Sequence, residues 1–145
     1  MEFFVNCNTA GLAPYNTALT RDKAEHLYRR LGFSASVDTI NQAIGMNSST
    51  LVDQLVAEAV ALPTTTPPVW AFWTHADYPA DNDTRNAMRA EQFREWTQTY
   101  TKELLQTNLR DRMSFFWSNH FVTEEDKYNC VNYLFEYTNC LQRNA

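Results

Sequence analysis

The sequence predicts an all-α protein, an irregular orthogonal bundle of about six helices with a long loop rich in proline and aromatic residues. The composition has 14% aromatic residues but only 3 glycines in 145 residues, which suits packed helices better than turn-rich sheets. Several segments repeat apolar residues with helical spacing, and no segment reads as a strand. The length is that of one domain. We expect an irregular lead-in over residues 1–19 and a single helical domain over residues 20–145.

The first helix is expected to begin after Thr20, a residue type that caps helix N-termini. Gly32 is expected to end it, and Phe33 to fold back onto its last turn. Its apolar positions follow the i, i+3, i+4, i+7 pattern: Ala24, Leu27, Tyr28 and Leu31.

Two shorter helices follow. Ser36 is expected to cap one that runs through Ile40 and Ile44 and stops at Gly45. The next opens at residues 47–49 and closes at Pro63. Its inward positions are Leu51, Val52, Leu55, Val56 and Ala59.

Residues 63–83 cannot form a regular helix, because prolines interrupt the segment. The loop also carries large aromatic residues, including Trp70, Trp73 and Tyr78. These rings either cover the apolar faces of neighbouring helices or form a stacking platform for a sugar. The covering role is the favoured interpretation, and Trp70 and Trp73 remain the candidate ligand-binding residues.

A long helix is predicted from about residue 84 to 107. Asn108 is expected to cap the next helix, which contains SFFWSNHFV at 114–122. Thr123 and Asp126 form a possible capping box for a last helix that reaches about Arg143.

Charge and composition exclude several classes of function. A net charge of −5 disfavours a nucleic-acid partner. No apolar run reaches the roughly 18 residues needed to cross a bilayer. The three cysteines are too few and too far apart for a disulfide framework, and we expect free, mostly buried thiols. No signal peptide is visible, so the compartment stays unknown.

No motif for metal, cofactor or nucleophile chemistry stands out. His26, His75 and His120 fall on different elements, so their spacing supports no metal site, and we expect neither a metal nor a cofactor. A G-x-S-x-G elbow and a glycine-rich phosphate loop are both absent from the sequence. Whether the protein is an enzyme stays open at this level.

The SFFWSNHFV stretch is the best candidate for a site. On a helix, His120 shares a face with Met113, Phe116 and Trp117. In one interpretation His120 bonds to the carbonyls that end its own helix, and Asn119 closes the turn before Thr123. In the other they converge with His26 and Arg30 on a polar pocket, where a buried histidine could act as a general base. The helix-end interpretation is favoured.

Two segments, HLYRRLGFSAS at 26–36 and RDRMSFFWSNHFVT at 110–123, resemble the bacterial family catalogued as domain of unknown function 1800. The resemblance covers nearly the whole chain and implies a largely helical protein, often exported, with no assigned activity. Members continue past the position of Ala145 with further helices, so the chain looks like an N-terminal portion. Where members commonly carry histidines, this sequence has Ser118 and Asn144.

Three functions therefore remain open. The favoured one is a structural or interaction module that contacts the remainder of its own chain or another protein. A second is part of a hydrolase-like enzyme in which His120, Asn119, His26 and Arg30 join a site completed by downstream chain. A third is a carbohydrate-binding surface that uses Trp70 and Trp73.

Overall fold

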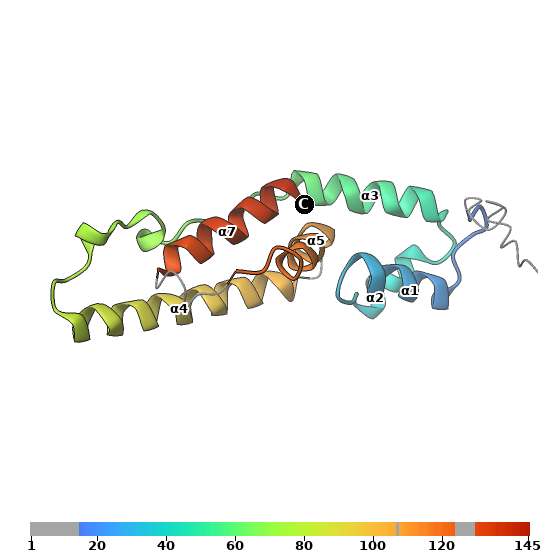
Figure 1. Cartoon of the computed structure of the whole chain (residues 1–145). Helices are drawn as coiled ribbons and strands as arrows, with labels where there is room; N and C mark the ends of the chain where they lie inside the picture. The colour runs from blue at the N-terminus through green and yellow to red at the C-terminus, as the bar shows by residue number, and fades with distance from the viewer. Residues whose placement is uncertain (1–14, 107, 124–129) are drawn as a thin grey trace, which may run out of the picture.

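The computed structural model describes residues 15–106, 108–123 and 130–145. This part of the chain is all-α, as predicted, with six α-helices and two short 3-10 turns (Figure 1). The elements in order are α1 (Arg21–Leu31), α2 (Val37–Ala43), α3 (Ser48–Ala61), η2 (Val69–Phe72), η3 (His75–Asp77), α4 (Asn82–Leu104), α5 (Leu109–Ser118) and α7 (Val131–Asn144).

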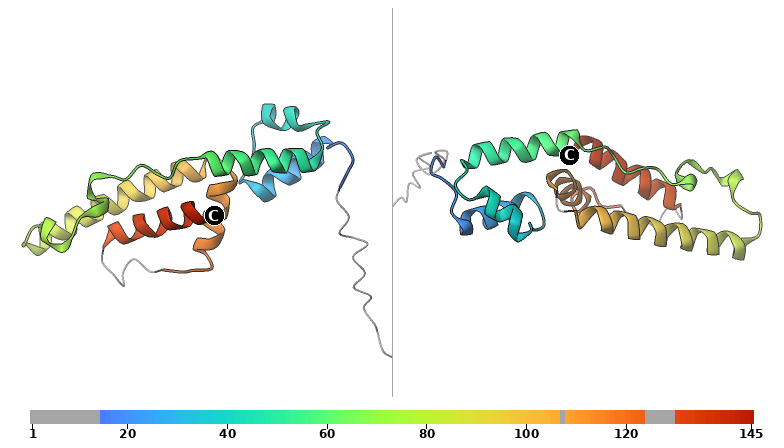
Figure 2. Two further views of the ribbon diagram at one scale, coloured as in Figure 1. Left: turned by 90° about the horizontal axis from the view of Figure 1, so that it is seen from above. Right: turned by 180° about the vertical axis from the view of Figure 1, so that it is seen from behind.

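The molecule is elongated, with one group of helices at each end (Figures 1 and 2). One group comprises α1, α2 and α3, and the other places α7 and the 3-10 turns along α4. Helix α5 lies between the groups and is seen end-on in Figure 1, where α3, α4 and α7 run across the view. This crossing is the orthogonal arrangement that the sequence predicted.

Each group has a buried apolar cluster of its own. The first cluster consists of Leu19, Ala24, Ile40, Ala43 and Leu51. The second consists of Trp70, Ala71, Val131 and Phe135, with Trp73 and Trp96 packed against it. Phe33 connects the first group to α5, because its ring meets the Phe115 ring edge-on at 5.6 Å. The Arg112 guanidinium lies 4.9 Å from the Phe33 ring centre, within the range of a cation–π contact.

Short-range signals explain most helix boundaries. Ser36, Asn47 and Asn108 cap α2, α3 and α5 as expected, each accepting a backbone N–H. Helix α4 begins at Asn82, earlier than predicted, because Asp81 accepts the Thr84 N–H at 2.8 Å. Bonds from the Thr84 hydroxyl and N–H hold the pKa of Asp81 below its usual value.

The turn between α2 and α3 depends on a glycine. Gly45 has φ of +88°, a left-handed conformation that residues with a Cβ adopt at a cost. Its N–H donates to Leu19 O at 2.9 Å, and the Leu19 N–H donates to Met46 O at the same distance. The glycine turn therefore holds the segment before α1 against the start of α3.

Three further expectations need correction, and one lies outside the described chain. Val56, expected to face inward, is 45% exposed. Cys140 is exposed rather than buried. Cys130 is the N-cap of α7 rather than an interior helical residue, because α7 begins at Val131. The capping box expected at Thr123 depends on residues 124–126, which lie outside the described residues.

Candidate functional site

Helix α5 carries the stretch that the sequence singled out, and its last turn is closed by its own polar side chains. Ser118 Oγ donates to Phe115 O at 2.7 Å, and Asn119 Nδ2 donates to the same oxygen at 2.9 Å. His120 Nδ1 lies 2.9 Å from Phe116 O. These are the carbonyls that a helix end leaves without intrahelical partners. The three side chains therefore stabilise the end of α5.

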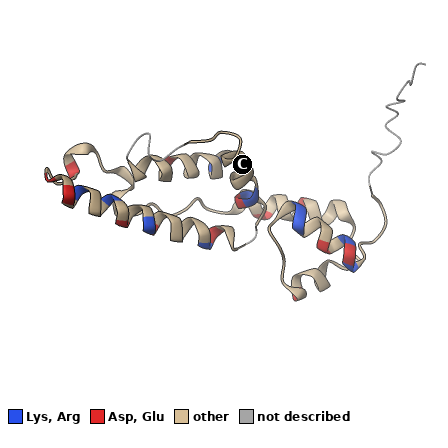
Figure 3. Cartoon of the chain, turned by 60° about the horizontal axis from the view of Figure 1, so that its bottom comes forward, with Lys and Arg blue, Asp and Glu red and all other residues tan. Residues whose placement is uncertain are grey.

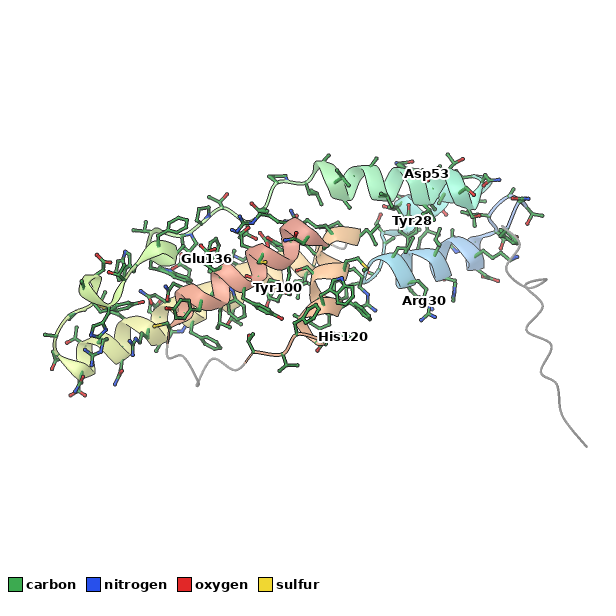
Figure 4. The ribbon with its side chains drawn as sticks, turned by 45° about the horizontal axis from the view of Figure 1, so that its top comes forward. Tyr28, Arg30, Asp53, Tyr100, His120 and Glu136 are labelled. Atoms are coloured by element: carbon green, nitrogen blue, oxygen red, sulfur yellow. The ribbon has the colours of Figure 1, made fainter. Side chains whose placement is uncertain are left out.

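His26 and Arg30, the other candidates for a shared polar site, both lie exposed on α1. Figure 4 shows Arg30 projecting outward from α1, with His120 at the far end of α5. None of the four candidate residues lines either of the two pockets described below. Their convergence on one catalytic site stays a prediction, and the contacts seen for His120 and Asn119 are those of a helix end.

The rings beside His120 form an exposed cluster that we call the aromatic end of α5: Phe116, Trp117, His120 and Phe121. The Trp117 and Phe121 rings stack at 5.4 Å, and the His120 ring lies 4.2 Å from that of Phe116. Phe121 is 59% exposed and the following Val122 is 71% exposed. The end of α5 thus presents apolar surface to solvent.

Trp70 is buried, at 6% exposure, and packs edge-on against Phe135 at 6.4 Å. Its Nε1 donates to Glu95 Oε2 at 2.6 Å. Trp73 is half-buried and meets the Tyr78 ring edge-on at 5.3 Å. In these positions both rings cover α4 and α7, and they do not form one flat exposed platform.

The sequence analysis missed a buried polar network at the start of α5. Asp111 is 1% exposed and pairs with Arg110, whose Nη2 lies 2.8 Å from Asp111 Oδ1. Asn108 Nδ2 donates to Asp111 Oδ2 at 2.6 Å, and Arg110 also donates to Pro63 O. The charged pair is therefore removed from water and hydrogen-bonded, as a buried ion pair requires.

The network extends to three further segments through Gln142 of α7, which is 4% exposed. Gln142 Nε2 donates to Asp111 Oδ1 at 3.2 Å and to Glu103 Oε2 at 2.8 Å. Thr65 lies in the loop at residues 63–81, which we call the proline loop. Its N–H donates to Gln142 Oε1 at 3.1 Å. In the sequence, the one signal for this network is the spacing of Asn108 and Asp111, which is typical of a helix N-cap. The other partners lie far apart along the chain.

A pocket of about 210 Å³ lies between the proline loop, α4 and α7. Its aromatic lining comes from Trp70, Trp96, Tyr100 and Phe135. Its polar lining comes from Glu95, Glu103 and the threonines at 65, 66, 99 and 138. One face of helix α4 therefore supplies most of one wall of the pocket, and the proline loop supplies another wall.

A second pocket, of about 190 Å³, shares Trp96, Tyr100 and Thr138 with the first and reaches Ser118. Figure 4 shows Tyr100 at this central position. Burial raises the pKa of the Tyr100 phenol, and the nearby Ser114 and Ser118 hydroxyls offset part of that effect. Within the described chain, the buried hydroxyl oxygens of Tyr100 and Ser114 make no hydrogen bond of good geometry.

The charged side chains of the described residues are spread along the helices. Lys and Arg alternate with Asp and Glu along α4 (Figure 3). Over the parts of the chain with described positions, no three His, Cys, Asp or Glu side chains gather closely enough to hold a metal. No helix among them is long and apolar enough to cross a membrane.

Comparison with known proteins places the chain in a family. No curated protein and no solved structure matches it. A family model described as protein of unknown function (DUF1800) matches residues 26–145, which is most of the chain and includes both segments quoted above. The chain therefore belongs to the DUF1800 family of proteins of unknown function.

Proposed function

We propose that the chain is a non-catalytic helical module, the N-terminal portion of a longer polypeptide, and that the helices following it pack on the aromatic end of α5. The observation that carries the proposal is the exposure of this surface. Phe116 is 44% exposed and Phe121 is 59% exposed, although the Phe116 ring meets Trp117 edge-on and the Phe121 ring stacks on Trp117. Contiguous aromatic surface of this kind is typical of an interface.

The composition of the surface favours a protein occupant. It combines Phe, Trp and His without a Lys or Arg side chain, so it lacks the cluster of basic side chains that binds phosphates or anionic lipids. Aromatic residues are enriched in the buried centres of protein interfaces. A protein segment with apolar side chains is the occupant that this chemistry fits.

Two observations favour the same polypeptide as the source of that segment. The family resemblance implies helices beyond the position of Ala145. The end of α7 also lies beside α5, where Gln142 bonds to Asp111 at 3.2 Å (Figure 2). A chain that continued from α7 would start beside the first turn of α5, one helix length of about 15 Å from the aromatic end, so a short connection would reach that surface.

Hydrogen–deuterium exchange tests the proposal by comparing residues 115–122 in the 145-residue chain and in a longer form that includes the further helices expected from the family resemblance. We expect protection of these amides only in the longer form. Phe121→Asp should lower the thermal midpoint of the longer form and leave the 145-residue chain nearly unchanged. Val69→Asp is the matched control, because Val69 is 87% exposed on η2.

Equal exchange in both forms would refute the assignment. So would sedimentation showing that the 145-residue chain dimerises and that Phe121→Asp restores the monomer, because the occupant would then be a second copy. A fall in the midpoint of the short chain with Phe121→Asp would show that the ring stabilises the module itself.

A further inference from the structure

We infer that the pocket between the proline loop, α4 and α7 binds a linear organic ammonium ligand carrying two or more positive charges. This site is separate from the aromatic end of α5 and does not depend on the function proposed for it. Four aromatic rings and two carboxylates line the pocket, and the described residues of its lining include no Lys, Arg or His. The pocket is therefore both apolar and negatively charged.

The polar groups of the pocket are mainly acceptors. Trp70 Nε1 is already engaged by Glu95 Oε2 at 2.6 Å, which leaves the other oxygen of that carboxylate for a ligand. Glu103 Oε2 accepts from Gln142 and Thr65, and Glu103 Oε1 accepts no hydrogen bond from the described residues. An ammonium group carries only donors, so it matches two carboxylates that have acceptor capacity to spare.

No ion pair joins these carboxylates to a Lys or Arg among the residues that the structure describes. Arg110, which joins the same network as Glu103, is paired with Asp111 at 2.8 Å. On α4, Arg94 is paired with Glu91 on the exposed side. A ligand with positive charge would therefore replace water without competing against a positive side chain in the pocket lining.

The aromatic lining adds a second reason for a cation. The Trp96 and Tyr100 rings stack at 5.5 Å with an angle of 13° between their planes. The faces of Trp and Tyr attract ammonium groups within about 6 Å, most strongly where water is excluded. Apolar methylene groups of a ligand would also be covered by Trp70 and Phe135, which are 6% and 2% exposed.

The spacing of the carboxylates indicates a linear ligand. Glu95 and Glu103 stand eight residues apart on α4, about 12 Å along the helix axis. Between them, Trp96, Thr99 and Tyr100 line the pocket along the same face. A chain of methylene groups with an ammonium at each end would place its charges near the carboxylates and its carbons on the rings.

A metal ion and a sugar fit the pocket less well. Three metal-ligating side chains do not come together anywhere in the part of the chain that the structure describes. Sugar sites usually pair hydroxyls with both donors and acceptors, whereas the two indole N–H groups here are directed to Glu95 and Thr138 and only the hydroxyls of threonines and Tyr100 are left as side-chain donors among the described lining residues. The excess of acceptors favours the ammonium ligand.

Isothermal titration of the 145-residue chain with spermidine, at low ionic strength, tests the inference. We expect saturable binding with one site per chain, weakened by added salt, and a change in tryptophan fluorescence. Octane-1,8-diol, a linear ligand without charge, should bind at least about tenfold more weakly, because a charged hydrogen bond is lost at each end. Cellobiose should not bind.

Three amide substitutions locate the site. Glu95→Gln and Glu103→Gln should each weaken spermidine binding about tenfold or more, and each amide oxygen can still accept one protein hydrogen bond. Glu91→Gln is the matched control, because Glu91 lies on α4 outside the pocket lining and removes the same charge. Circular dichroism would verify that each variant is folded.

Three results would overturn the inference. One is the absence of saturable binding to spermidine at millimolar concentration. Another is an equal loss of affinity in Glu91→Gln, which would indicate attraction to the net charge alone. The third is binding of cellobiose in place of spermidine. If Glu103→Gln fails to fold, Glu95→Gln decides the question, because Glu95 contacts only Trp70 among the described hydrogen bonds.

Discussion

Single residues show where this protein places charge inside its fold. Asp111 and Arg110 are adjacent in the sequence, and both are almost wholly buried. Polar side chains at the opposite end of the same helix, from Ser118 to His120, stay near solvent and close the last turn. The two ends of α5 therefore use polar residues for different purposes: the first joins segments together, and the last ends a helix.

Asp111→Ala tests the buried end. The substitution leaves the Arg110 guanidinium buried without its partner, and removing one member of such a pair typically costs about 3–5 kcal/mol. Urea unfolding should show that Asp111→Ala lowers the free energy of unfolding by an amount in that range. Glu91→Ala removes an exposed partner of Arg94 and should cost no more than about 1 kcal/mol. Similar losses of unfolding free energy in both variants would mean that the buried network stabilises the fold no more than an exposed ion pair does.

His120→Ala tests the exposed end. The change removes one hydrogen bond to Phe116 O and one ring contact, so we expect a loss below about 1.5 kcal/mol in thermal or urea unfolding. Asn119→Ala should have a similar effect, because its amide bonds to Phe115 O. A much larger loss of unfolding free energy for His120→Ala would show that His120 stabilises other parts of the fold besides the end of its helix.

At the scale of elements, turns and caps determine where each helix begins and ends. Asp81 at the start of α4 and Asn108 at the start of α5 both accept backbone N–H groups. The proline loop contributes two short 3-10 turns in place of a helix, with Thr74 and Asp77 closing a capping box around the second. These local devices keep the loop packed on α4 and α7.

Gly45→Ala tests the turn between α2 and α3. No atom lies within 4 Å of an added Cβ, so the cost comes from the positive φ of +88° alone. That conformation costs a non-glycine residue about 1–2 kcal/mol. Chemical denaturation should show a loss of that size for alanine and a smaller one for Gly45→Asn, because asparagine tolerates left-handed backbone. Equal losses would point to a side-chain clash.

At the scale of the whole molecule, the two apolar clusters are joined by α5. Phe33 and Arg112 connect it to the first group, and the network around Asp111 connects it to the second. The described residues of the single domain predicted for 20–145 thus form two apolar clusters joined by α5.

Leu51→Ala measures the coupling between the two clusters. Leu51 is 2% exposed in the first cluster, and the truncation should cost about 2–5 kcal/mol there. We expect hydrogen exchange to accelerate throughout α1, α2 and α3 and to change little in α7. Phe135→Ala should give the reverse pattern, because Phe135 belongs to the second cluster. Uniform acceleration in both variants would show one cooperative unit.

The sequence by itself determined the helices of this protein, because caps, glycines, prolines and apolar spacing act over a few residues. Ser36, Asn47, Asn108 and Gly45 mark boundaries that the structure confirms. The all-α class and the packed aromatic loop follow from the same local signals.

Only the tertiary structure decided which polar groups meet. Thr65, Glu103, Asp111 and Gln142 come from four segments, and Thr65 and Gln142 stand 77 positions apart. No periodic pattern links such residues, because their contact depends on how α5 crosses α7 and where the proline loop returns. The pocket beside them arises in the same way, since its rings and carboxylates belong to a loop and two helices that only the fold brings together.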